Sequence, residues 1–246
     1  MNKLAVVNEF NGIVRQAIEK GDAGVLAIFA ELLLKPEHGF KQAYPDWQFI
    51  SDAQKRLNLP RDIETWLLLQ RVIQFMEGKD ATKATYTGKT NLVEVDWQLI
   101  GALSERPKAQ IQTNKGLITW ELYPEDAPAT VTQFVHLVKS NFYTNKTFHR
   151  VVPNFVVQGG CPRGDGWGGF ELTIPTEPNP RKHYDASGYV GMASAGRDTE
   201  STQFFMTHTP TIHLDDNYTI FAKVIGGMDV LHQLTVGDTI QTIRLE

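Results

Sequence analysis

Residues 148–160 read FHRVVPNFVVQGG and place a cation, an aromatic ring and an amide in one short segment. In a single extended strand, side chains alternate between two faces, so Arg150 would share a face with Gln158 while Phe155 would not. A bulge or bend at residues 153–154 would bring all three side chains onto a common face. Taken alone, the Phe-His-Arg tripeptide favours a structural strand whose arginine pairs with a nearby acid.

A second segment changes this interpretation. Residues 191–207 read GMASAGRDTESTQFFMT and end in an apolar run. The two segments, in this order, resemble the signature of the cyclophilin family of peptidyl-prolyl cis-trans isomerases. The resemblance runs from about Lys108 to Leu245. It does not cover the first hundred residues.

The resemblance implies an enzyme that isomerises X-Pro bonds in peptides and folding proteins and needs no cofactor or metal. It implies catalytic roles for Arg150, Phe155 and Gln158. The substrate-binding positions that it implies are His149, Met192, Ala193, Ser194, Ala195, Gln203, Phe205, His213, Leu214 and Tyr218.

Three of these positions differ from the best-known eukaryotic members of the family. Ser194 stands where they carry Asn, His213 where they carry Trp, and Tyr218 where they carry His. Ser194 should matter little if the residue acts through its backbone. Tyr218 keeps a flat ring with a hydroxyl donor, so activity is still expected.

The chemistry of the reaction suits these residue types. Rotation about an X-Pro bond makes and breaks no covalent bond, so the catalyst must favour the twisted amide, whose nitrogen regains a lone pair. Arg150 could donate a hydrogen bond to that nitrogen, because its guanidinium is permanently charged and rigidly forked. Without the two motifs, the apolar residues Phe155, Met192, Phe205 and Leu214 would be interpreted as ordinary core residues.

Other functional classes fit less well. His208, His213 and Asp215 suggest a metal site, but neither HExxH nor another short ligand motif is present. Ser194 lies in GMASAG, which is not the GxSxG motif of a serine hydrolase. The remaining alternative is a proline-peptide-binding chaperone or assembly module with little turnover.

Composition narrows the class of protein further. The chain has 246 residues and 41% hydrophobic residues, enough for one large domain or two small ones. It carries 24 Lys and Arg against 28 Asp and Glu, so we expect no nucleic-acid partner. Cys161 is the only cysteine, which excludes an intrachain disulfide and a cysteine-rich metal site.

Targeting signals are not evident in the sequence. No apolar run approaches the roughly 20 residues of a membrane-spanning helix, and the N-terminus lacks the apolar core of a signal peptide. We therefore expect a cytoplasmic protein as the chain is written. A periplasmic location is expected if the chain is an excised fragment of a longer exported protein.

The N-terminal part has helical periodicity. Residues 10–18 and 25–33 each place apolar side chains on one face and predict a helical hairpin, with Asp22 capping the second helix. A second pair is predicted over residues 46–57 and 62–77, ended by Gly78. Two hairpins suit HEAT-like repeats; a small four-helix domain and helices docked on the neighbouring barrel are the alternatives. This part is also a candidate binding site for another protein.

The pattern changes near residue 80. We predict an all-α helical domain over residues 1–80, a polar connector over 81–105 and a mainly-β isomerase domain over 106–246. A helix is predicted from Pro128 to about Ser140. Strands are predicted over 109–113, 117–122, 189–193, 203–207, 219–224 and 240–245, with Gly116 in the first turn. Pattern alone predicts a sandwich or barrel; the family resemblance implies a closed antiparallel barrel of eight strands capped by two helices.

Overall fold

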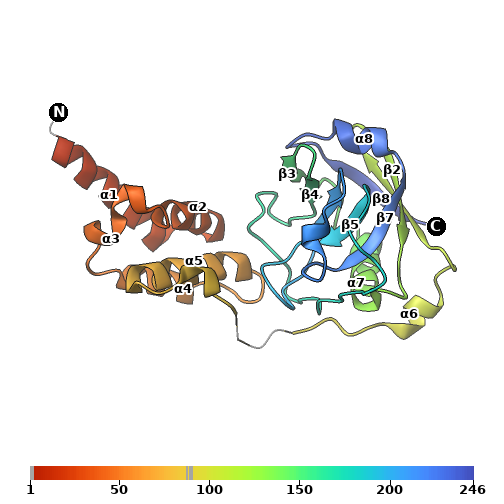
Figure 1. The fold of residues 1–246 in the computed structure, drawn as a ribbon, viewed down its shortest axis with the longest axis horizontal. Helices are drawn as coiled ribbons and strands as arrows, with labels where there is room; N and C mark the ends of the chain where they lie inside the picture. The colour runs from red at the N-terminus through yellow and green to blue at the C-terminus, as the bar shows by residue number, and fades with distance from the viewer. Residues whose placement is uncertain (1–2, 87, 89–90) are drawn as a thin grey trace. The chain divides into compact units, whose positions relative to one another are not determined.

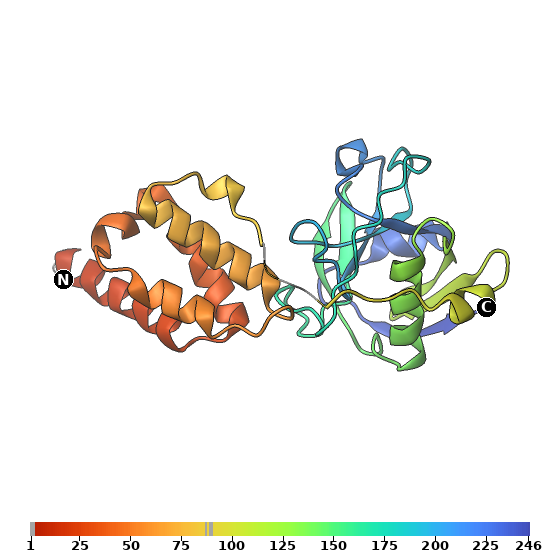
Figure 2. The same ribbon diagram turned by 90° about the horizontal axis from the view of Figure 1, so that it is seen from below.

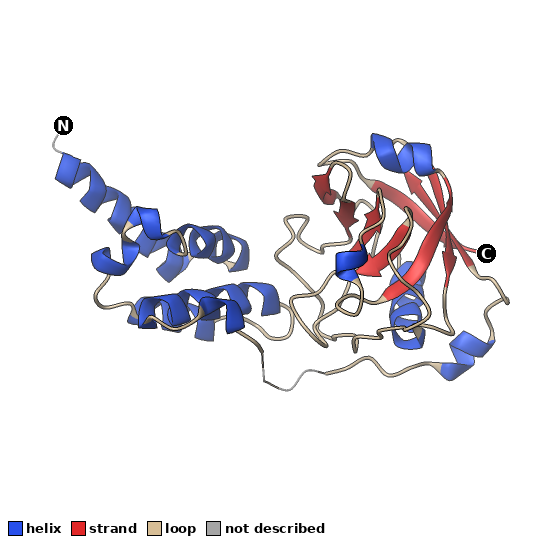
Figure 3. Cartoon of the chain, viewed as in Figure 1, coloured by secondary structure: helices blue, strands red, loops and turns tan. Residues whose placement is uncertain are grey.

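The computed structural model describes residues 3–86, 88 and 91–246. Contacts within the chain divide it into two compact units, Met1–Lys89 and Thr90–Glu246. The first unit is helical and the second is built on a curled antiparallel sheet, as the colouring of Figure 3 shows. Residues 87, 89 and 90 of the predicted connector lie outside the described residues.

The main helices of the first unit are α1 (Lys3–Lys20), α2 (Ala23–Leu33), α4 (Gln48–Lys55) and α5 (Ile63–Glu77). Shorter elements are η1 (Pro36–His38), α3 (Phe40–Ala43) and η2 (Ala81–Lys83). Helix α1 packs against α2 and α4, and α5 packs against the same two helices, so the four close a ring of contacts (Figure 2). This is the packing of a small four-helix arrangement, and the HEAT-like interpretation stays a prediction.

The predicted caps of these helices are confirmed. The Asp22 carboxylate accepts a hydrogen bond from the Val25 N–H at 3.0 Å, which satisfies one free donor of α2. Gly78 follows α5 with φ 78°, a left-handed conformation that glycine adopts without steric cost.

The apolar faces of α1 and α2 are only partly buried. Val14 and Ile18 of α1 are completely buried, whereas Phe10 and Ile13 are 45% and 53% exposed. Helix α2 likewise buries Leu26, Ala30 and Leu33 and leaves Val25 and Ile28 exposed. The apolar stripes that predict these helices are therefore wider than the surfaces that pack.

The second unit contains one eight-stranded sheet in the order β3-β4-β6-β5-β7-β2-β1-β8. Its neighbouring strands are all antiparallel. The strands are β1 (Lys108–Thr113), β2 (Gly116–Leu122), β3 (Phe148–Val152), β4 (Val156–Gly159), β5 (Tyr189–Met192), β6 (Phe204–Thr207), β7 (Ile220–Gly226) and β8 (Ile240–Leu245). Gly116, predicted to lie in the first turn, begins β2 directly after that turn with φ 144°, a conformation that favours glycine.

The two outer strands of this sheet approach each other. Thr147 and Thr239 form an antiparallel bridge, and the Phe148 N–H donates to the Asp238 carbonyl at 2.8 Å. At the start of β1, Lys108 exchanges two backbone hydrogen bonds with Glu246, the residue after β8, at 3.0 and 2.9 Å. The first strand of the unit therefore begins where the last strand ends.

Helices α7 (Pro128–Lys139) and α8 (Met228–Gln233) lie at opposite ends of the curled sheet (Figures 1 and 3). Inside the sheet, the buried rings of Trp120, Phe134, Phe204 and Phe221 form the centre of the core. Trp120 and Phe204 meet edge to face with ring centroids 4.9 Å apart. The short helices α6 (Trp97–Gly101) and η3 (Ile212–Leu214) complete the unit.

Part of the predicted connector packs on the sheet unit. The Val93 N–H donates to the Thr173 carbonyl at 2.8 Å, and the side chains of Val93 and Leu99 belong to the core of this unit. Alternation of apolar residues within this short segment is consistent with that contact. Residues from 91 onward thus fold with the second unit, while the predicted domain boundaries stay a prediction.

Among the helices that the structure describes, none is both long enough and apolar enough to cross a membrane.

Candidate functional site

Arg150 and Gln158 face each other across a hairpin. Strands β3 and β4 pair with Arg150 opposite Gln158, because the chain turns back at residues 153–155, where Asn154 has φ 60°. The bend predicted at this point is therefore a complete reversal of the chain. It places the Arg150 Nη1 3.3 Å from the Gln158 Oε1, to which it donates a hydrogen bond.

A chain of amides continues from this pair into the protein. The Gln158 Nε2 donates to the Gln203 Oε1 at 3.1 Å. Gln203 is buried, and its own Nε2 donates to the carbonyls of Gly166 and Gly168 at 3.0 Å each. Each of these side chains is held by the next, so the exposed Arg150 guanidinium is supported by the buried Gln203 side chain.

Aromatic rings lie beside the guanidinium. The Arg150 Cζ is 5.9 Å from the centre of the Phe155 ring, which stacks on His213 with centroids 5.4 Å apart. Phe205 meets Tyr218 edge to face at 5.6 Å. Phe155, Phe205 and Tyr218 belong to one apolar cluster. Its other members include Val156, Tyr184, Ala193, Leu214 and Ile220. The site thus combines a fixed cation with a partly open apolar surface.

Met192 occupies a different place from these rings. Its side chain is buried in the main core of the sheet together with Phe204, its partner in the β5–β6 pair. Its backbone N–H donates to the Thr219 carbonyl at 3.0 Å. The structure therefore brings Phe155, Phe205 and Leu214 into one cluster and places Met192 behind it.

His149 supports the arginine side of the site. A Cβ atom at Gly166 would lie only 3.1 Å from the His149 Cδ2, so the imidazole packs closely against the loop that receives Gln203. Burial lowers the pKa of His149, with the positive charge of Arg150 acting in the same direction and Asp165 opposing it. The ring is therefore neutral at pH 7.

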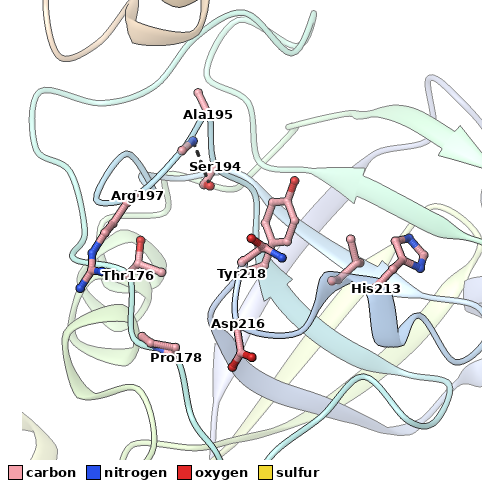
Figure 4. A pocket seen from close by; sticks show the side chains of 11 residues that line it. Thr176, Pro178, Ser194, Ala195, Arg197, His213, Asp216 and Tyr218 are labelled. Carbon is pink, nitrogen blue, oxygen red and sulfur yellow. Dashed lines mark hydrogen bonds between the residues drawn. The ribbon is translucent and has the colours of Figure 1, made fainter. Parts of the chain in front are cut away.

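A pocket of about 750 Å³ adjoins the apolar cluster (Figure 4). Sequence reasoning predicted Ser194, Ala195, His213, Leu214 and Tyr218 among its lining residues. It missed Thr176, Pro178, Gly196, Arg197, Asp216 and Asn217. Figure 4 shows Tyr218 and Asp216 on one side and Thr176, Pro178 and Arg197 on the other. Arg150, Phe155 and Gln158 do not line this pocket.

The pocket wall is held by hydrogen bonds within its loops. The Thr199 Oγ1 accepts from the Ala195 N–H at 2.9 Å and donates to the Gly196 carbonyl at 2.7 Å. Thr176 and Asp198 exchange two hydrogen bonds of 2.9 and 2.8 Å between backbone and side chain. The backbone that lines the pocket is thus arranged before a ligand arrives.

No three His, Cys, Asp or Glu side chains come together to hold a metal ion in the part of the chain that the structure describes.

Comparison with known proteins gives a family for the sheet unit. Residues 108–245 match the model of the family described as cyclophilin type peptidyl-prolyl cis-trans isomerase/CLD. Peptidyl-prolyl cis-trans isomerase B of Bacillus subtilis is 45% identical over 129 residues, which span 52% of this chain and 90% of the relative.

Solved structures show the same similarity. The crystal structure of a cyclophilin type peptidyl-prolyl cis-trans isomerase from Cryptosporidium parvum matches with a TM-score of 0.55 and 30% identity. That match covers 57% of this chain and 98% of the parasite protein. A second structure of the parasite protein, in the presence of the dipeptide Ala-Pro, matches with a TM-score of 0.54 and 30% identity over 56% of this chain and 98% of the other.

Proposed function

This chain belongs to the cyclophilin-type family of peptidyl-prolyl cis-trans isomerases, and on that premise we propose that it rotates X-Pro bonds of peptides and folding proteins, with Arg150 stabilising the twisted amide. The observation that carries this assignment is the support of Arg150 by Gln158 beside an apolar cluster. Proline-containing peptides are the proposed ligands, and unfolded client proteins are the proposed larger substrates.

The barrier to be lowered comes from amide resonance. It amounts to about 18–20 kcal/mol, and it makes the uncatalysed rotation take tens to hundreds of seconds. Twisting the bond returns a lone pair to the proline nitrogen, and a donor aimed at that nitrogen stabilises the twisted state more than either planar state. No proton transfer or covalent intermediate is needed.

The geometry around Arg150 suits this task. Gln158 accepts from one guanidinium nitrogen, which leaves other N–H groups of the fork free to turn toward a bound peptide. The permanent charge of the guanidinium strengthens a hydrogen bond to the amide nitrogen. Because Gln203 holds Gln158 in turn, less conformational entropy is lost when the donor acts.

The apolar cluster is the proposed seat of the proline ring. Phe155, Phe205, Leu214 and Tyr218 offer a mainly apolar surface beside the guanidinium, which suits the apolar proline ring. Ser194 and Ala195, in the pocket next to this surface, are proposed to contact the extended peptide through their backbone. The parasite relative crystallised with Ala-Pro supports a proline-containing ligand for this chain.

We further propose that the sheet acts as a closed barrel. The Thr147–Thr239 bridge and the hydrogen bond from Phe148 to Asp238 support closure between β3 and β8. Closure would remove both sheet edges and fix the β3–β4 hairpin that carries Arg150. The helical unit, with its exposed Phe10, Ile13, Val25 and Ile28, is proposed to bind another protein.

An isomerisation assay on a proline tetrapeptide tests the assignment of Arg150. We expect Arg150→Ala to lose roughly 100-fold or more in kcat/KM, the usual loss when one donor to a developing lone pair or charge is removed. Arg150→Lys should recover little, because a single ammonium cannot reproduce the planar fork held by Gln158. Tyr218→Phe is the comparison within the same site and should keep a substantial part of the activity, because its ring still closes the pocket.

Thermal unfolding of the same variants separates catalysis from folding. Arg150 is exposed, so its replacement should leave the unfolding temperature nearly unchanged. Near-normal turnover of Arg150→Ala would contradict the proposed role, as would a loss of activity matched by loss of the fold. Tight peptide binding by the wild-type protein without turnover would favour the binding module instead.

A further inference from the structure

Glu200 is a buried carboxyl group beside the substrate pocket. Its side chain is 0% exposed, its backbone carbonyl accepts from the Ile174 N–H at 2.7 Å, and its Oε1 accepts from the Thr219 N–H at 3.1 Å. The Oε2 has no hydrogen-bond partner among the residues that the structure describes. A buried carboxylate with an unsatisfied oxygen costs far more free energy than the neutral acid, so this environment favours the protonated form.

The residue that Glu200 holds, Thr219, directly follows a residue of the pocket wall. Thr219 follows Tyr218 directly, and hydrogen bonds hold all of its polar groups. Its N–H donates to Glu200. Its carbonyl accepts from the Met192 N–H at 3.0 Å, and its Oγ1 accepts from the Glu177 N–H at 2.8 Å. Tyr218 lines the pocket, whereas Glu200 does not. Glu200 therefore acts on the pocket through the peptide of Thr219.

The charges around Glu200 oppose its ionisation. Burial raises the pKa of Glu200 to about 8, the hydrogen bonds with Thr219 act in the opposite direction, and the carboxylates of Glu177 and Asp198 raise it further. Tyr184 also faces it, and the pKa of its buried phenol is raised by burial and by the charge of Glu200. Most molecules therefore carry a neutral Glu200 at pH 7.

We propose that Glu200 is a positioning residue that holds Thr219 and the neighbouring Tyr218 and Met192 in place for substrate binding only while it is protonated. The inference rests on the proposed isomerase function. When pH rises, the Glu200 carboxyl releases its proton to solvent, and the carboxylate then lies in a dry site close to two other acids. Repulsion and the need for hydration displace it, and the Thr219 peptide moves with it. Substrate binding is thus present below the pKa of Glu200 and is lost above it.

The experiment measures KM and kcat for a proline tetrapeptide from pH 6.5 to 9.5 by exchange NMR, which needs no coupling protease. For the full wild-type chain, we expect KM to rise about tenfold between pH 7 and pH 9, the rise that follows if only the protonated form holds the pocket. The value of kcat should change little, because the donor proposed to act in the rotation step is the permanently charged guanidinium of Arg150 and not a group held by Glu200. A KM that stays constant through pH 9 would overturn the proposal.

Two variants isolate the titrating group. Glu200→Gln keeps an acceptor oxygen for Thr219 and cannot ionise, so its KM should stay near the wild-type pH 7 value at every pH. Glu171→Gln makes the same chemical change at an exposed position and should follow the wild-type profile. A rise of KM in Glu200→Gln equal to that of the wild type would assign the pH effect to another group and sink the proposal.

A measurement without substrate keeps the inference separate from the proposed function. The ¹³C-methyl resonance of Met192 in the wild-type protein should shift with a midpoint near pH 8 and should not shift in Glu200→Gln. If the variant does not fold, the wild-type titration alone decides, and a Met192 resonance that does not move overturns the proposal. If the wild type shows no turnover, the isomerase assignment fails, while this titration still tests the role of Glu200.

Discussion

Gly191 shows how closely single atoms fit around the pocket. It lies in β5 opposite Phe205 of β6, and a Cβ atom built on it would lie 2.0 Å from the Tyr184 Oη and 2.6 Å from the Phe205 Cζ. Neither contact is possible without movement of a ring. Glycine is therefore required here by close approach, because the two rings occupy the space of a side chain.

We expect Gly191→Ala to lower the free energy of unfolding of the sheet unit by about 1–3 kcal/mol, the usual cost of overpacking a well-filled core. Phe205 is also expected to move, which should weaken peptide binding. Urea unfolding followed by tryptophan fluorescence measures the first effect. Gly101→Ala is the matched control in the same unit, because nothing lies within 4 Å of its Cβ position, and an equal loss in both variants would contradict the steric argument.

Residues of the site differ in how far the sequence predicts them. Arg150 and Gln158 are predicted because one short segment contains both, and a turn between them suffices to bring them together. Thr176 and Asp216 are not predicted, since only tertiary folding brings their loops to the same pocket. Glu200 lies in the polar run RDTEST, which is typical of an exposed loop, so no signal in the sequence indicates its burial.

At the scale of elements, helix α7 depends on a distant cap. Its N-cap position is Ala127, which offers no side-chain acceptor, and the sequence nevertheless predicts the helix from Pro128 and its apolar face. The Glu177 carboxylate accepts from the N–H groups of Ala129 and Thr130 at 2.9 Å each and from the Thr130 hydroxyl at 2.7 Å. A negative charge at this helix end also interacts favourably with the helix dipole.

Glu177→Ala should therefore destabilise the sheet unit by about 1–2 kcal/mol, the cost of losing a cap together with its charge. Urea unfolding at two salt concentrations measures the loss and its electrostatic part. Glu125→Ala removes the same charge from an exposed residue shortly before α7 and should cost much less. Equal effects of the two substitutions would mean that net charge, and not the hydrogen bonds, carries the stabilisation.

Periodicity predicts the existence of helices better than the faces they bury. The stripe predicted to be buried in α5 consists of Ile63, Trp66, Leu69, Ile73 and Met76, and all of them except the half-buried Trp66 are buried. In α1 and α2, two of the five residues of each predicted stripe are exposed, because each helix packs against two neighbours that cover only one side of it. The sequence shows which residues form the apolar stripe of a helix. The way in which neighbouring helices cross it decides which of those residues are covered.

At the scale of the whole molecule, residues 91–105 decide where the sheet unit begins. Val93 and Leu99 belong to its core, and Val93 is also bonded to Thr173. A fragment that starts at residue 106 loses both side chains from the core, whereas one that starts at residue 91 keeps them.

We expect the fragment 91–246 to be more stable than 106–246 by about 3–6 kcal/mol, from roughly 1.5–3 kcal/mol for each of the two buried aliphatic side chains. Urea unfolding of the two fragments measures the difference. Equal stabilities would show that these residues only lie on the surface of the unit, and would support a boundary at residue 106. A fragment 91–246 that fails to fold would show that the two units form one cooperative whole.

The paired backbones of Lys108 and Glu246 have a consequence for how such a unit spreads among proteins. Because the first and last strands begin and end side by side, residues 91–107 are the only described part of the unit that precedes the sheet. Another domain can therefore be fused ahead of residue 91 without breaking a strand. In evolutionary terms, gene fusion can join this unit to a new domain, such as a helical one, while the fold that carries its site is inherited intact.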